Sequence, residues 1–172
     1  MKNIFLSCLL LLVTTSVLVS QNTLASPRDS ASGKIDDASV SVNYGSPSVK
    51  GRKIWGKLVP FGKVWRTGAN EATRFTTSKD LLVEGQTLAA GTYGLFTIPG
   101  EKTWTVIFNK VSRQWGAFEY SDKEDALRVT VAPNKSDTLT ERLNFAIEKN
   151  QLVMRWENIA LPVKVATKKG SE

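Results

Sequence analysis

The side chains best suited to chemistry are concentrated in one short segment, residues 63–73. The segment combines an aromatic face, a guanidinium, an amide, a carboxylate and a hydroxyl, carried by Trp65, Arg66, Asn70, Glu71 and Thr73. Polar groups on a loop that a rigid scaffold holds in place commonly form ligand sites. We therefore predict that Arg66 binds an anionic group and that Trp65 stacks on a ring. The structural alternative is an Arg66–Glu71 ion pair, with Asn70 capping a turn through its own backbone.

Trp115 completes the predicted binding set, because it stands in a polar connection, residues 109–116. An exposed indole at that position would offer a stacking platform for sugar rings or an anchor at a membrane interface. Trp104 and Trp156 instead alternate with other residues in strand-like segments. We therefore expect these two tryptophans in the core.

A carboxylate-dependent hydrolase would need two acids about 5 to 10 Å apart across a cleft. Glu71 is the candidate catalytic residue, and its candidate partners are Asp125 and Glu124. The acidic run at residues 120–125 lacks the glycine and the spaced oxygen ligands of a calcium loop, so we interpret it as a solvated turn. The sequence thus predicts no metal site and no cofactor.

The composition excludes several other kinds of site. The chain has no histidine, and its one cysteine, Cys8, lies in the apolar start of the sequence. A Ser-His-Asp triad, a histidine or cysteine zinc site and a disulfide are therefore excluded once that start is removed. The sequence also contains no phosphate-cradling glycine loop, Ser-x-x-Lys element or nucleophile elbow.

The first 25 residues are typical of a signal peptide. Met1 and Lys2 precede an apolar run, residues 4–19, which is shorter than the roughly 20 residues of a permanent membrane span. We expect cleavage after Ala25, with Ser20 as the second choice, and export to the periplasm or beyond. The formal net charge of +7 then favours acidic envelope partners over nucleic acid, although it could serve solubility alone.

The rest of the chain predicts one all-β domain. Residues 26–37 are small and polar and indicate a flexible leader, residues 38–167 form the domain, and residues 168–172 form a disordered tail. Apolar residues alternate with polar ones in about eight or nine short segments, which favours a β-sandwich or jelly roll, with an open barrel as the alternative. Residues 45–72 break the pattern and are either a functional loop or two short edge strands.

Several motifs in this sequence resemble the domain-of-unknown-function family 2911 of secreted bacterial proteins. They are found at residues 44–47, 51–56, 58–60, 62–73, 90–93, 96–99, 104–109, 115–116 and 127–129. The resemblance covers nearly all of the processed chain. It implies an exported protein, but it brings no established activity, ligand or catalytic residue.

Three functions are compatible with these observations. The first is a noncatalytic envelope module that binds an anionic or carbohydrate ligand such as an envelope glycan, and this is the function that we favour. The second is a hydrolase that uses Glu71. The third is an assembly protein that pairs with a partner through an exposed edge strand.

Overall fold

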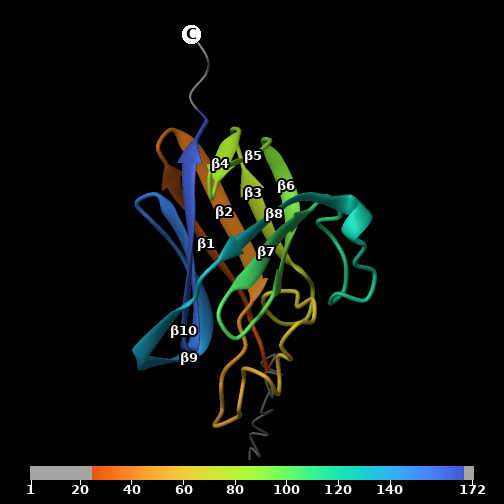
Figure 1. Cartoon of the computed structure of the whole chain (residues 1–172), viewed down its shortest axis with the longest axis vertical. Helices are drawn as coiled ribbons and strands as arrows, with labels where there is room; N and C mark the ends of the chain where they lie inside the picture. The colour runs from red at the N-terminus through yellow and green to blue at the C-terminus, as the bar shows by residue number, and fades with distance from the viewer. Residues whose placement is uncertain (1–24, 169–172) are drawn as a thin grey trace, which may run out of the picture.

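The computed structural model describes residues 25–168, which form two antiparallel β-sheets packed against each other (Figure 1). One sheet has the strand order β1-β2-β3-β6-β7-β8 and the other has the order β5-β4-β10-β9. The strands are β1 (Arg28–Ile35), β2 (Ala38–Gly45), β3 (Thr73–Thr77), β4 (Leu81–Val83), β5 (Gln86–Leu88), β6 (Gly91–Ile98), β7 (Trp104–Asn109), β8 (Asp125–Val131), β9 (Asn134–Glu148) and β10 (Gln151–Thr167). The predicted all-β sandwich is confirmed.

The prediction of a flexible leader over residues 26–37 is wrong. Residues 28–35 form β1, which pairs with β2 along its whole length, from Arg28 opposite Gly45 to Ile35 opposite Ala38. All of β1 except Ala31 and Ile35 is exposed, so the strand lacks the apolar alternation that marks a half-buried strand. Backbone hydrogen bonds to β2 hold β1 in the sheet. Such bonds do not depend on side-chain type, so the amino-acid composition does not reveal them. The predicted signal peptide and Cys8 lie outside the described residues.

The inner strands follow their sequence pattern. In β2 the side chains of Val40, Val42 and Tyr44 are buried while their neighbours are more exposed, because alternate residues of a strand face opposite sides of the sheet. β6 and β7 differ, because they are buried on both faces. Their outer face carries Phe96 and Ile107, each 0% exposed, under a cover from residues 60–72 and 110–121.

The last strand reverses direction within its span. The Val165 N–H donates to the Asn150 carbonyl at 2.8 Å, although the intervening residues, fully extended, would span about 45 Å. Glu157, with a φ of +55°, lies where the chain turns back. The returning arm pairs with β4, from Val165 opposite Val83 to Thr167 opposite Leu81.

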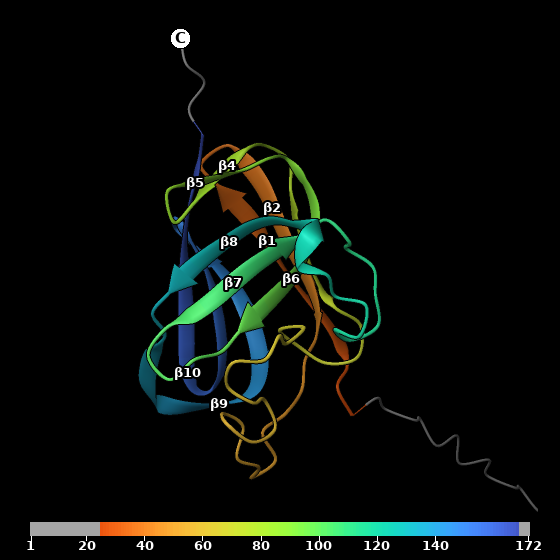
Figure 2. The ribbon, with the colours of Figure 1, turned by 45° about the vertical axis from the view of Figure 1, so that its right-hand side comes forward.

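Residues 46–72 contain no strand, as the loop interpretation of this segment predicts. Isolated bridges join Ser48 to Arg142, Trp65 to Thr97 and Glu71 to Trp115. The segment lies at the lower end of the molecule in Figure 1, and the loop of residues 110–121 projects from the side of the sandwich in Figure 2. Within residues 25–168 we find no helix with the length and apolar character of a membrane span.

Candidate functional site

Trp65 belongs to a cluster of four tryptophans. Its ring lies 5.8 Å from those of Trp55 and Trp156, and Trp55 lies 4.8 Å from Trp104. The Trp65 indole N–H donates to the Gly68 carbonyl at 3.1 Å. The cluster joins residues 46–65 to β7 and β10, so the ring predicted to stack on a ligand packs on the protein itself. Trp104 and Trp156 are in the core, as predicted.

Thr73 is also turned inward. It is 0% exposed and its hydroxyl donates to the Thr67 carbonyl at 2.9 Å. Thr67 has a φ of +52°, a left-handed conformation that costs a β-branched residue about 1–3 kcal/mol. The chain crosses β2 closely here, because a Cβ on Gly45 would lie 2.2 Å from the Ala69 carbonyl oxygen. Residues 67–73 therefore stabilise the fold by packing closely on β2 and through the Thr73–Thr67 hydrogen bond.

The expected ion pair between Arg66 and Glu71 does not form. Glu71 accepts from the Arg28 guanidinium at 2.7 Å instead, and Asn70 donates to the Ser26 carbonyl at 3.1 Å rather than capping its own backbone. The Arg66 side chain is half-buried, and its Nε has no hydrogen-bond partner among the described residues. Burial lowers the pKa of Arg66. Asn70 and Glu71 thus hold the residues that precede and begin β1.

Glu71 and Trp115 do come together, although they lie far apart in the sequence. Their backbones form an antiparallel bridge, flanked by hydrogen bonds of 3.0 Å from Ala72 to Gln114 and from Gly116 to Asn70. A groove of about 450 Å³ lies along this junction. Its polar and aromatic lining is formed by Glu71, Arg74, Ser112, Arg113, Gln114 and Trp115.

The groove presents cations beside an aromatic surface. Trp115 is 62% exposed, as the polar connection around it predicts. Within residues 25–168 neither Arg74 nor Arg113 forms an ion pair, whereas the charge of Glu71 is offset by Arg28. The Gln114 side chain is 7% exposed and its Oε1 has no hydrogen-bond partner among those residues. The arrangement suits a ligand that combines a ring with an anionic group.

Sequence reasoning missed Arg74, Ser112, Arg113 and Gln114. Arg74 carries a signal that could have identified it, because it stands between the buried residues Thr73 and Phe75 and must point to the opposite face of β3. Arg113 and its neighbours carry no such signal. Only the pairing of their loop with residues 70–72 brings them to β3.

A hydrogen-bond network centred on the Asp125 side chain anchors the loop of residues 110–121. Asp125 Oδ2 accepts from the Tyr120 hydroxyl at 2.7 Å and from Arg128 at 2.6 Å, and its Oδ1 accepts from Asn109 at 2.8 Å. Burial, followed by the hydrogen bond to Asp125, raises the pKa of Tyr120 to about 12. The Asp125 side chain is only 7% exposed, so the interpretation of residues 120–125 as a solvated turn is wrong at this position.

A family model described as a protein of unknown function, DUF2911, matches residues 26–165. The chain belongs to this family. Comparisons with curated proteins and with solved structures give no match. The family model begins at the residue before Pro27, so it includes β1 and both walls of the groove.

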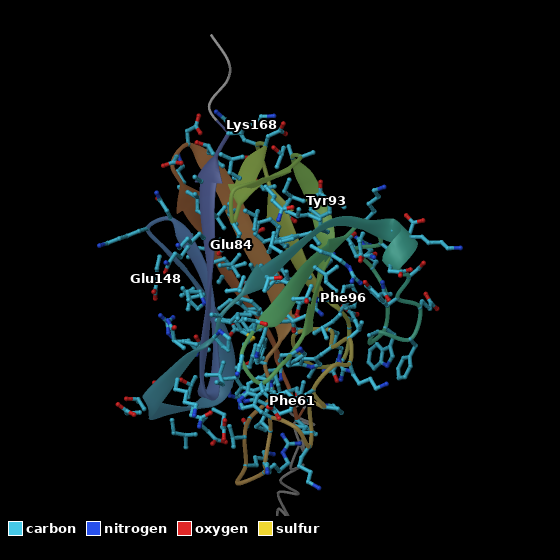
Figure 3. The ribbon with its side chains drawn as sticks, viewed as in Figure 1. Phe61, Glu84, Tyr93, Phe96, Glu148 and Lys168 are labelled. Carbon is cyan, nitrogen blue, oxygen red and sulfur yellow. The ribbon has the colours of Figure 1, made fainter. Side chains whose placement is uncertain are left out.

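The groove is not the largest hollow of the fold. A hollow of about 1100 Å³ lies on the other sheet, where its lining includes Leu82, Glu148 and Lys164. Figure 3 shows Glu148 on the opposite side of the molecule from Phe96. Glu148 is paired with Arg155 at 2.9 Å, and none of the described residues that line this hollow is aromatic. We assign the candidate site to the smaller groove because it combines an exposed indole with two guanidinium groups that have no carboxylate partner within residues 25–168.

Proposed function

We propose that this protein is a noncatalytic binding module of the bacterial envelope that takes an acidic saccharide, one bearing carboxylate or phosphate groups. The observation that carries the proposal is the exposed Trp115 beside Arg74 and Arg113, which form no ion pair among the described residues. An indole stacks on the apolar face of a sugar ring, and a guanidinium binds a carboxylate or phosphate through two parallel hydrogen bonds.

The size and rigidity of the groove support this function. Its volume of about 450 Å³ falls within the range of roughly 300–1,000 Å³ that is usual for small-molecule sites. Backbone hydrogen bonds fix both walls, and the Asp125 network holds the loop that carries Trp115. Pre-organised walls reduce the entropy cost of binding. The signal-peptide-like start of the sequence supports a location in which envelope glycans are the available acidic saccharides.

The geometry gives the hydrolase alternative no comparable support. Glu71 and Asp125 already accept hydrogen bonds from Arg28 and Arg128, at 2.7 and 2.6 Å. A two-carboxylate hydrolase needs a pair of acids across a cleft, and Glu71 is the one acid among the described residues that line the groove.

The proposal is tested by isothermal titration calorimetry with oligogalacturonate, a chain of uronic acids, and with an uncharged oligosaccharide of equal length. We expect binding of the charged chain only, weakened by added salt. The double variant Arg74→Gln/Arg113→Gln should bind at least roughly tenfold more weakly. The matched control is Lys149→Gln/Lys164→Gln, which removes the same charge at the larger hollow. If both double variants lost the same affinity for oligogalacturonate, binding would depend only on net charge, which would contradict the proposed site.

A further inference from the structure

A second surface, separate from the groove, is formed by residues 46–65. Figures 1 and 2 show these residues as loops that extend beyond the strands at the lower end of the molecule. Between Asp37 and Glu71 the sequence has no acidic residue. It has six cationic ones in that interval, which are Lys50, Arg52, Lys53, Lys57, Lys63 and Arg66. All of these except the half-buried Arg66 are exposed.

The same surface exposes two large apolar side chains, Leu58 at 46% and Phe61 at 40%. Leu58 and Phe61 project from a compact turn, in which the Val59 N–H donates to the Ile54 carbonyl at 3.0 Å. The side chains of Ile54 and Val59 are buried. The Phe61 ring lies over Gly56, where a Cβ would be 3.0 Å from the ring. Figure 3 labels Phe61 at this end of the molecule. The two apolar side chains are thus held outward by a hydrogen-bonded turn.

Little negative charge offsets these cations. Glu141 contacts the surface, where its Oε1 accepts from the Lys50 N–H at 2.9 Å. The turn between β6 and β7 also reaches it, because the Gly62 N–H donates to the carbonyl of residue 99 at 2.8 Å. That turn carries one acidic and one basic residue, Glu101 and Lys102, whose charges cancel. The surface therefore remains strongly positive.

We infer that this surface, which we call the cationic tip, docks on an anionic lipid bilayer. Leu58 and Phe61 enter the interface between headgroups and acyl chains, while Lys53, Lys57 and Lys63 contact lipid phosphates. Exposed apolar side chains surrounded by lysines are the composition that binds such interfaces. A soluble polyanion would satisfy the lysines but would gain nothing from Leu58 and Phe61. The charge and the apolar pair together therefore favour a lipid surface.

The test is flotation of the full-length protein with vesicles of phosphatidylcholine, with and without phosphatidylglycerol. Two tip variants are compared, Lys53→Gln/Lys57→Gln/Lys63→Gln and Leu58→Ser/Phe61→Ser. The matched control is Lys34→Gln/Lys149→Gln/Lys164→Gln, which removes the same charge from exposed positions on β1, on the turn between β9 and β10 and on β10. All variants share the same residues 1–24, so any binding by those residues is common to all. The groove variant Trp115→Ala is included to separate the two proposals.

Wild type should float with the phosphatidylglycerol vesicles and be released by salt. Each lysine removed from the tip should weaken binding roughly fivefold, and the serine variant should bind more weakly than wild type at unchanged charge. Trp115→Ala should bind vesicles like wild type even if it fails to bind a saccharide. The inference is overturned if tip and control lysines contribute equally, or if no variant of the tip changes flotation. It is also overturned if the serine variant binds vesicles as tightly as wild type does. That result would indicate that the ligand of the tip is a soluble polyanion.

Discussion

The tryptophan cluster and the groove use the same kind of side chain in opposite ways. At the cluster, the rings of Trp55, Trp65, Trp104 and Trp156 pack on one another and join residues 46–65 to both sheets. At the groove, Trp115 is 62% exposed. One short stretch of chain supplies both regions, because Trp65 enters the cluster and Glu71 lines the groove.

Residues that are close together in the sequence need not act together in the structure. Trp65 and Thr73 face inward and stabilise the fold, whereas Glu71 and Arg74 face the groove. The sharp turn at Thr67, with its left-handed φ of +52°, lies between Trp65 and Glu71, and alternation along β3 turns Thr73 inward and Arg74 outward. Substitutions in the first group should therefore change stability, and substitutions in the second should change binding.

The largest expected effect comes from truncating the cluster. Trp65→Ala should lower the free energy of unfolding by about 3 kcal/mol, because it leaves a cavity beside the rings of Trp55 and Trp156. Trp115→Ala should change it by less than about 0.5 kcal/mol, because that ring is mostly in solvent. Urea unfolding measures both. If the two variants lost similar amounts of unfolding free energy, the cluster and the groove would not differ in their contribution to stability.

A smaller effect is expected from the hydroxyl that closes the turn. Thr73→Val leaves the buried Thr67 carbonyl without its partner and should cost about 1–3 kcal/mol. The control is Thr76→Val on the same strand, whose hydroxyl bonds to Thr92 at an exposed position and should cost about 0.5 kcal/mol or less. Thermal unfolding measures the stability of both variants. A larger loss of stability in the control would show that the Thr73 hydroxyl does not stabilise the turn.

The network that anchors the loop of Trp115 can be tested through the pH dependence of stability, because it includes Tyr120. Its pKa is raised from 10.0 to about 12, so the folded state favours the neutral phenol. The stability gained from this preference is fully present below about pH 10 and is lost as the pH rises through about 12. Urea midpoints measured across that window should fall more steeply for wild type than for Tyr120→Phe. Parallel curves would show that the Asp125 network does not hold the phenol neutral.

A small effect on stability is expected at the ion pair beside the groove. Glu71→Gln should change the free energy of unfolding by about 0–1 kcal/mol, because both partners are partly exposed. It should tighten the binding of oligogalacturonate, since it removes a negative charge from the lining. Calorimetry measures the affinity. Weaker binding by this variant would show that Glu71 contacts the ligand as an acceptor.

Much of the fold could be predicted because the inner strands bury one face. Alternation identified β2 and β3, and likewise the edge strand β8, where every second side chain is in the core. β1 could not be identified in this way, because backbone hydrogen bonds and not buried side chains hold it. The exposed Trp115 was predictable from its polar surroundings. The outward direction of Arg74 was predictable from the alternation in β3, but its proximity to Arg113 was not, because a bridge between distant segments brings the two together.

We expect Trp115, and not the tryptophan cluster, to contact the ligand. The direct test is a titration of ¹⁵N-tryptophan-labelled protein with oligogalacturonate, followed through the indole N–H resonances of its five tryptophans. Trp115→Phe assigns one of these resonances by removing it. The account predicts that this resonance moves with added ligand while those of Trp55, Trp65, Trp104 and Trp156 stay in place. A shift among the cluster resonances with Trp115 unmoved, or no shift at saturating oligogalacturonate, would contradict it.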